Sequence, residues 1–243
     1  MKSQQPPIEV LYRDQAMVAV AKPGGLLVHR SRESTDRVFL LQLLRDQLGA
    51  HLFPVHRLDR ATSGVMVFAF SSDDARLLQS ALESATKDYV VLVRGATASA
   101  FDCDRPLRNE RGEPQECRSS FVKLAEFSRC SLLQGTIQTG RRHQIRRHLA
   151  HAAYQVIGDT TYGKGRINQF FRDEYALPRL FLHSWRLTVC HPRDGRSLQL
   201  GVPLAADLTA FLRRLPDVPA DVVAALTAPI MPPAGGGSCQ SGD

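Results

Sequence analysis

The sequence predicts an α+β protein, because runs typical of β-strands and amphipathic runs typical of helices follow one another along the chain. Residues 65–70 form a β-branched and aromatic run, as expected for a buried strand. Residues 121–127 and 130–137 have the pattern of two further strands in an antiparallel meander. Residues 38–48 and 73–84 carry apolar side chains at helical spacing, which predicts two helices that each pack one face against the sheet.

The N-terminal part is predicted to begin with a strand, a turn and a second strand over residues 8–28. Lys22-Pro23-Gly24-Gly25 supplies the break between the two strands. Ser34 or Thr35 is the expected cap of the first helix, and Ser71 or Ser72 that of the second.

The second half of the chain continues with strands and short helices. A β-rich run at 87–95 has a tyrosine near its start, and residues 179–189 and 198–202 form a predicted hairpin. A short closing helix is expected at 207–215.

These elements predict one folded domain over residues 8–215, preceded by a flexible segment at 1–7. The segment 216–243 is rich in proline, alanine and glycine, and the sequence predicts that it is disordered.

The composition indicates a soluble protein that binds a polyanion. Lysine and arginine together number 31 against 24 acidic residues, and the formal net charge is +7. Only five of these basic residues are lysines, and the planar fork of arginine suits bidentate contacts to phosphate, so RNA is a plausible partner. GC-rich coding, which favours arginine codons, is the alternative explanation.

The remaining bulk features predict a reduced, cytoplasmic protein. Five cysteines are scattered singly without a Cys-x-x-Cys pair, which argues against a disulfide framework and a zinc site. Residues 1–9 lack the apolar core of a signal peptide, and no apolar run approaches the length of a membrane span.

The chain is organised around the loop His56 to Gly64, which precedes the strand at 65–70. Asp59 stands between Arg57 and Arg60, and two neighbouring cations favour the ionised form of a carboxylate. Gly64, at the junction of loop and strand, indicates an unusual backbone angle or the close approach of a ligand. A plain surface ion cluster is the alternative interpretation of the charged residues.

A second informative segment runs from Thr139 to Gly163. On a helical wheel, apolar residues 145, 149, 152 and 153 share the inward face; Arg146 lies beside this stripe, whereas His143 points the other way. A partly buried Arg146 needs an anion, and Asp59 is the best candidate. The histidines at 143, 148 and 151 do not share one helical face, so no metal site is predicted.

These residues limit the chemistry. The sequence contains neither a recognisable Ser-His-Asp set, nor a phosphate-cradling glycine loop, nor a second paired carboxylate. The expected reaction therefore starts from one carboxylate, acting as nucleophile or general base without a cofactor.

The motifs resemble those of the RluA family of pseudouridine synthases. The segment His56-Arg57-Leu58-Asp59-x-x-Thr62-Ser63-Gly64 is similar to that family's catalytic motif, and Lys87-x-Tyr89 is similar to its tyrosine motif. The arginine motif of the family is similar to two segments of this chain taken together, Thr139-Gly140-Arg141-x-His143-Gln144-Ile145-Arg146-x-His148 and Gly158-Asp159. The resemblance spans residues 8 to about 213.

The resemblance implies a fold, a reaction and a set of roles. The fold would be a mixed, largely antiparallel sheet with flanking helices and an active-site cleft across it. The reaction would turn a uridine of RNA into pseudouridine without metal or cofactor, with Asp59 attacking either C1′ of the ribose or C6 of the base. Arg146 would keep Asp59 ionised, and Tyr89 would stack on the uracil and is a candidate for removing the C5 proton.

The same resemblance implies substrate contacts for further residues. Arg57 would fill the space left by the flipped uridine, and Ile145 would pack beside Tyr89. The motifs also make candidate substrate-binding residues of His56, Thr62, Arg141 and His143.

The substrate expected from the resemblance is tRNA. Segments 25–31, 146–151 and 162–172 resemble the tRNA pseudouridine synthase C branch, which implies uridine 65 in the T-stem. A ribosomal RNA synthase of the same family remains an alternative, as does a non-catalytic RNA-binding or chaperone module. A hydrolase that uses His56 or His143 as base lacks a partner nucleophile. The protein is expected to act as a monomer.

Overall fold

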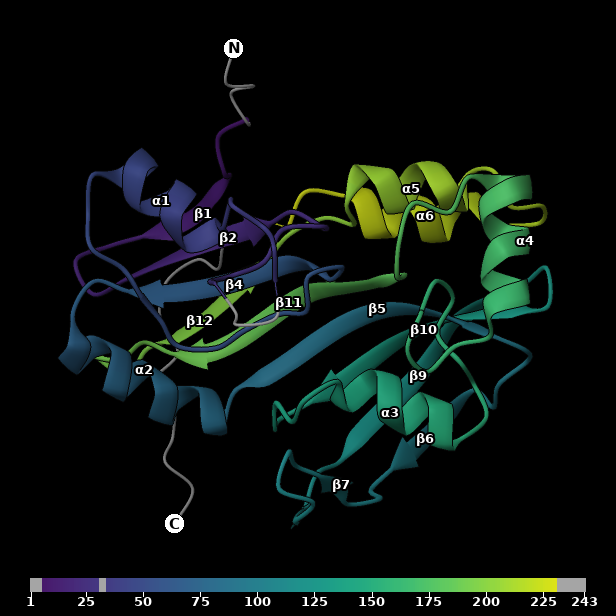
Figure 1. Cartoon of the computed structure of the whole chain (residues 1–243), viewed down its shortest axis with the longest axis horizontal. Coiled ribbons are helices and arrows are strands. Elements are labelled where there is room, and N and C mark those ends of the chain that lie inside the picture. The colour runs from purple at the N-terminus through teal and green to yellow at the C-terminus, as the bar shows by residue number, and fades with distance from the viewer. Residues whose placement is uncertain (1–5, 31–33, 231–243) are drawn as a thin grey trace.

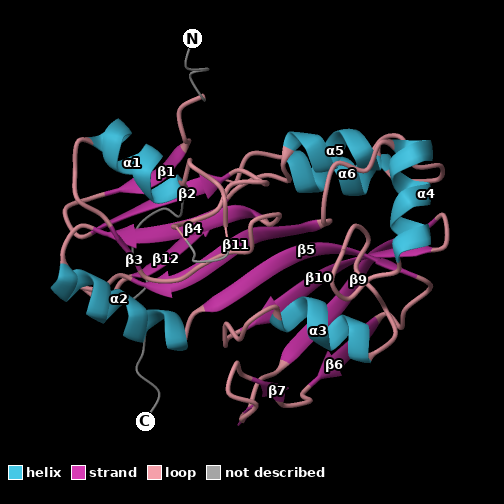
Figure 2. Cartoon of the chain, viewed as in Figure 1, coloured by secondary structure: helices cyan, strands magenta, loops and turns pink. Residues whose placement is uncertain are grey.

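The computed structural model describes residues 6–30 and 34–230, which form one large twisted sheet with helices at its flanks (Figures 1 and 2). The central path of the sheet runs β1-β2-β4-β11-β5-β10-β9-β6, with β12 paired to β11 and β3 paired to β4. Within the described residues β4 and β11 pair in parallel, and the other strand pairs are antiparallel. The predicted mixed, largely antiparallel α+β fold is therefore confirmed.

The first half of the chain builds one side of the sheet. Its elements are β1 (Val10–Arg13), β2 (Met17–Lys22), α1 (Leu40–Leu48), β3 (Phe53–Pro54), β4 (Ser63–Ala69) and α2 (Ser72–Glu83). The predicted helices at 38–48 and 73–84 are both present, and the Ser71 side chain caps α2 by accepting from the Asp74 N–H. The cap predicted for α1 is wrong, because its N-cap is Phe39, which makes no side-chain cap bond.

The second half builds the other side. Its strands are β5 (Thr86–Arg94), β6 (Ala100–Cys103), β7 (Leu107–Arg108), β8 (Pro114–Gln115), β9 (Ser119–Phe127), β10 (Cys130–Ile137), β11 (Leu182–Cys190) and β12 (Ser197–Gly201). Its helices are α3 (Gln144–His151), α4 (Gly165–Tyr175), α5 (Ala206–Leu212) and α6 (Ala220–Thr227). The meander β9–β10 and the hairpin β11–β12 confirm the predicted strands.

The structure departs from the predicted elements in two places. Residues 26–28 are not a strand but contribute only an isolated bridge from Leu27 to Phe39. Helix α4 was not predicted, because its apolar residues are few and it follows a glycine-rich turn.

The folded part extends beyond residue 215, which corrects the predicted boundary of the disordered tail. Helix α6 lies against α5, where Leu226 is buried in the same core cluster as Phe211. The Leu204 N–H also donates to the Leu226 carbonyl. Four apolar positions in 216–230 provide enough packing surface to order the segment (Val218, Val222, Leu226 and Ile230). The rest of the predicted tail, and most of the segment 1–7, lie outside the described residues.

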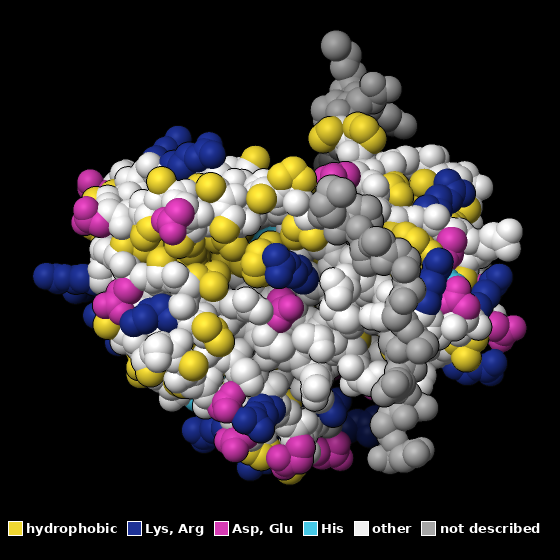
Figure 3. Space-filling view, turned by 180° about the vertical axis from the view of Figure 1, so that it is seen from behind, with side chains coloured by type: hydrophobic (Ala, Val, Ile, Leu, Met, Phe, Trp, Pro, Cys, Tyr) yellow, Lys and Arg dark blue, Asp and Glu magenta, His cyan; other side chains and the backbone are white. Residues whose placement is uncertain are grey.

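Four hydrophobic clusters fill the space between the sheet and its helices. Helix α3 covers the sheet on the side that faces the viewer in Figure 1. On the opposite side, basic side chains lie in small groups mixed with acidic ones over the part that is not hidden (Figure 3).

Candidate active site

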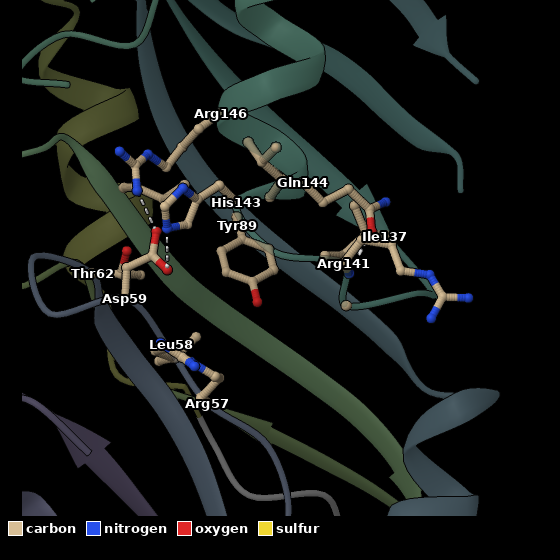
Figure 4. A pocket seen from close by; sticks show the side chains of 13 residues that line it. Arg57, Leu58, Asp59, Thr62, Tyr89, Ile137, Arg141, His143, Gln144 and Arg146 are labelled. Carbon is tan, nitrogen blue, oxygen red and sulfur yellow. Dashed lines mark hydrogen bonds and ion pairs between the residues drawn. The ribbon is translucent and has the colours of Figure 1, made fainter. Parts of the chain in front are cut away.

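Asp59 lies in the loop between β3 and β4, at the wall of a pocket that residues of β5, β10, β11 and α3 also line (Figure 4). The Thr62 N–H donates to the Asp59 carbonyl at 3.0 Å, so a tight turn follows the aspartate. The Asp59 side chain is 24% exposed, and Oδ2 accepts a hydrogen bond of 2.7 Å from Arg146. The ion pair predicted from the sequence is present.

Arg146 binds a second carboxylate, Asp159, which the sequence reasoning did not assign. Its Nε donates to Asp159 Oδ2 at 2.7 Å, and one terminal nitrogen donates to Oδ1 at 2.8 Å. The other terminal nitrogen remains for Asp59, so the planar guanidinium is shared by two carboxylates. A role for Asp159 could have been inferred from the sequence, because Gly158-Asp159 is part of the segments that resemble the arginine motif.

Burial and pairing compete at this cluster. Burial lowers the pKa of Arg146, but the hydrogen bonds to Asp159 and Asp59 outweigh it and raise the pKa above the usual value. Burial likewise raises the pKa of Asp159, whereas Arg146 and the backbone N–H groups of Thr161 and Tyr162 lower it overall. The Asp159 side chain has no exposed area, while Asp59 is accessible from the pocket. Of these two carboxylates, Asp59 is the one that a substrate can reach.

His143 lies inside the pocket, contrary to the helical-wheel prediction. Helix α3 begins at Gln144, and His143 is its N-cap with φ 54° and ψ 31°, so the wheel does not apply to it. Its Nε2 lies 3.6 Å from Asp59 Oδ1, and its Nδ1 lies 3.0 Å from the Tyr162 hydroxyl. Burial lowers the pKa of His143, which favours a neutral ring.

Tyr89 comes from β5 and lines the pocket together with Ile145, Leu58 and Leu182. These apolar neighbours surround the ring, and burial raises the pKa of Tyr89 to about 12. The phenol therefore keeps its proton at neutral pH. Ile145 is 4% exposed and lies beside the pocket, as expected.

The remaining predicted residues fall into two groups. Arg57, Thr62 and Arg141 line the pocket with Asp59; the two arginines are exposed, and the Thr62 hydroxyl is buried without a partner among the described residues. His56 does not line this pocket. Its Nε2 accepts a hydrogen bond from the Val67 N–H, which ties the ring to β4.

Two basic side chains, neither of which was predicted to contact it, hold the loop that carries Asp59. Lys22 donates to the carbonyls of Arg60 and Thr62 at 3.2 and 2.7 Å, and Arg179 donates to the Ala61 carbonyl at 2.8 Å. The three carbonyls that follow Asp59 thus each accept a hydrogen bond from the side chain of Lys22 or Arg179. Burial lowers the pKa of Lys22 to about 7, and Asp207 pairs with Arg179 through both carboxylate oxygens.

Gly64 ends the loop in a place where no other residue fits. Its φ is +121°, and a Cβ at this position would lie 2.0 Å from the Ser184 carbonyl oxygen on β11. The unusual backbone angle is confirmed, but the group that approaches Gly64 is the Ser184 carbonyl of β11 and not a ligand. This close approach brings β4 and β11 into their parallel pairing.

The described residues contain no group of three or more histidine, cysteine or acidic side chains that could hold a metal ion. Across the same ranges, no helix has the length and apolar character needed to cross a membrane.

Comparisons with known proteins agree on one family. A model of the family described as RNA pseudouridylate synthase matches residues 16–151. The tRNA pseudouridine synthase C of Vibrio vulnificus is 39% identical over 210 residues, covering 76% of this chain and 86% of the relative. The enzyme of the same name from Haemophilus ducreyi is 36% identical over 221 residues, covering 81% and 91%.

Solved structures show the same fold. The structure of human RNA pseudouridylate synthase domain containing 4 superposes with a TM-score of 0.70 at 23% identity, covering 85% of this chain and 92% of that one. Human RNA pseudouridylate synthase domain containing 1 gives 0.68 at 22% identity, covering 84% and 86%.

Proposed function

The chain belongs to the RNA pseudouridylate synthases of the RluA family and is an isomerase of that family, and from this premise we propose that it converts one uridine of a tRNA to pseudouridine with Asp59 as nucleophile. The observation that carries the proposal is the shared guanidinium of Arg146. It binds the buried Asp159 with two nitrogens and offers the third to Asp59, the carboxylate that opens into the pocket.

The pairing suits a nucleophile, because it fixes the position of the Asp59 carboxylate on the pocket wall. Asp59 would attack C1′ of the ribose or C6 of the uracil. In either case the N1–C1′ bond breaks, the C5–C1′ bond forms, C5 loses its proton and N1 gains one. The atoms balance within the nucleotide and water, so the reaction requires neither an energy source nor a redox partner.

Tyr89 and Ile145 would hold the uracil between them while it turns from N1 to C5. A ring that keeps its proton at neutral pH is suited to stacking. If Tyr89 also removes the C5 proton, its hydroxyl must first release its own proton. His143 lies on the other side of the site, where its Nε2 is 3.6 Å from Asp59 Oδ1 and its ring is neutral.

Entry of a nucleotide requires a rearrangement at the mouth of the pocket. The pocket holds only about 80 Å³, which is small beside the 300–1,000 Å³ typical of ligand sites. Arg57 and Arg141 are exposed there and can swing aside. Arg57 would then occupy the stack that the flipped uridine leaves, which offsets part of an unstacking cost of a few kcal/mol.

The choice of tRNA is supported by the relatives at 36–39% identity, whose name specifies that substrate. We extend the proposal to uridine 65 of the T-stem, on the branch features of segments 146–151 and 162–172. The predicted cytoplasmic location fits this substrate.

The experiment is a pseudouridine map of total RNA, read from carbodiimide-dependent reverse-transcription stops. RNA from cells that lack the gene is compared with RNA from the same cells carrying the wild type or Asp59→Ala. We expect one T-stem stop to disappear without the gene and to return with the wild type only. A lost stop in ribosomal RNA would keep the reaction and overturn the substrate, and rescue by Asp59→Ala would overturn the nucleophile in favour of a binding module.

A further inference from the structure

A second hollow lies next to the active-site pocket, between the C-terminal end of α2 and the segment 138–141. Its volume is about 490 Å³, within the range of small-ligand sites. Gly140 and Arg141 line both this hollow and the active-site pocket, so the two are contiguous. In Figure 4 the Arg141 side chain extends away from Asp59.

One residue that lines the hollow has a ring N–H that the fold does not use. His56 lines the hollow, and the Val67 N–H donates to His56 Nε2 at 3.0 Å. In a neutral imidazole this leaves the proton on Nδ1, which has no hydrogen-bond partner among the described residues. Burial lowers the pKa of His56 to about 4, so the ring stays neutral at physiological pH.

The other walls combine apolar surface with polar groups. Val55 and Leu82 are buried at the lining, while Gln79 and Glu83 are exposed on the last turns of α2. The Lys87 ammonium is not available to a ligand, because it donates to the carbonyls of Leu82, Ala85 and Gln138. These three bonds instead fix the distance between α2 and the segment 138–141.

The charged side chains around the hollow favour a base over a phosphate as its occupant. The carboxylate of Glu83 repels phosphate, and the apolar walls with a single ring N–H donor suit the flat edge of a nucleobase. Arg141 stands between the two hollows, where the phosphate that joins two successive nucleotides would lie. The planar guanidinium of arginine can donate two hydrogen bonds to one phosphate group, so Arg141 suits a phosphate better than a base.

We propose that this hollow binds the base next to the target uridine in the RNA strand, with His56 as hydrogen-bond donor, Gln79 and Glu83 at the rim and Arg141 on the intervening phosphate. The proposal rests on the function proposed above and adds a specificity site to it. The enzyme would then extrude two neighbouring bases, and the second base would contribute to the choice of the modified position.

The experiment combines a filled hollow with a missing base. Gln79→Trp places a bulky ring in the hollow, and the matched control is Ser80→Trp, an exposed neighbour on the same helix that does not line it. Three RNAs are compared. The first is a synthetic tRNA with a single target uridine, and the other two carry in addition an abasic nucleotide directly 5′ or directly 3′ of that uridine. The readout is kcat/KM, from the release of tritium placed at C5 of that uridine.

We expect Gln79→Trp and one of the two abasic RNAs each to lower kcat/KM by about tenfold, the order expected for loss of one hydrogen-bonded base contact. Together they should lower it no further, because both remove the same contact. The control Ser80→Trp should match the wild type.

Losses that multiply, or a normal rate with Gln79→Trp, would overturn the second base site while leaving the catalytic proposal standing. Failure of the wild type on the intact tRNA would instead overturn the proposed substrate, and the site with it.

Discussion

Arg146→Met removes the guanidinium that links two carboxylates, and it is expected to damage stability and activity by separate routes. Asp159 has no exposed side-chain area, so the variant leaves a buried charge with only the N–H groups of Thr161 and Tyr162. Removing one partner of a buried ion pair costs about 3–5 kcal/mol. Since a domain unfolds at about 5–15 kcal/mol, the single variant should be marginally folded.

The double variant Arg146→Met with Asp159→Asn separates the two effects. The asparagine removes the buried charge and still offers Oδ1 to the two N–H groups, so more than half of the lost unfolding free energy should return. Activity should not return, because Asp59 still lacks its cation. The expected loss is about 10²–10³-fold in kcat, as for removal of one preorganised electrostatic partner.

Unfolding in urea is followed by the fluorescence of Trp185, the single tryptophan, which is 7% exposed. Turnover is measured by tritium release from RNA labelled at uracil C5. Asp159→Asn alone serves as the control, because it keeps the bond from Arg146 to Asp59. A double variant that folds and turns over at the wild-type rate would refute the role given to the Arg146–Asp59 pair.

Three further predictions concern other parts of the site. Tyr89→Phe keeps the stacking ring, so KM should stay within about twofold while kcat falls about 10²-fold or more if the hydroxyl moves the C5 proton; an unchanged kcat would exclude that transfer. Arg179→Met frees the Ala61 carbonyl and should lower kcat more than it raises KM, whereas Arg186→Met, an exposed control stacked on Trp185, should not; equal effects would contradict the loop clamp. Burial lowers the pKa of His183 to about 4 from an ordinary value near 6.5, so below pH 6.5 the unfolded chain binds more protons than the folded chain. The free energy of unfolding should therefore fall as the pH drops toward 4. Urea unfolding curves at pH 7 and pH 5 with the same midpoint would show that His183 does not titrate this way.

Local pattern predicted most of the elements. Alternation and β-branched runs were enough for the strands β4, β9 and β10, because one buried face imposes its period on the sequence. Local pattern did not predict α4, where only a few side chains are buried. It also did not predict α6, because a segment rich in proline and alanine is typical of a disordered tail. In both segments the ordering comes from contacts with distant parts of the chain.

The motifs of the chain identify the principal chemical groups of the candidate site. Asp59, Tyr89 and Arg146 stand in motifs whose order and spacing are specific, and the partner of Arg146 could be inferred because a buried cation requires an anion. The family followed from the same motifs, since a nine-residue pattern is readable without any coordinates.

The way these groups are held follows from the tertiary fold and not from any local pattern. Asp159 shares the guanidinium, His143 turns into the pocket through a left-handed backbone angle, and Lys22 and Arg179 bind the carbonyls after Asp59 from far along the chain. Such contacts depend on distances between backbone atoms that meet only when the sheet closes. A hydrogen bond from a buried cation to a main-chain carbonyl leaves no periodic mark in the sequence, because every residue has that carbonyl.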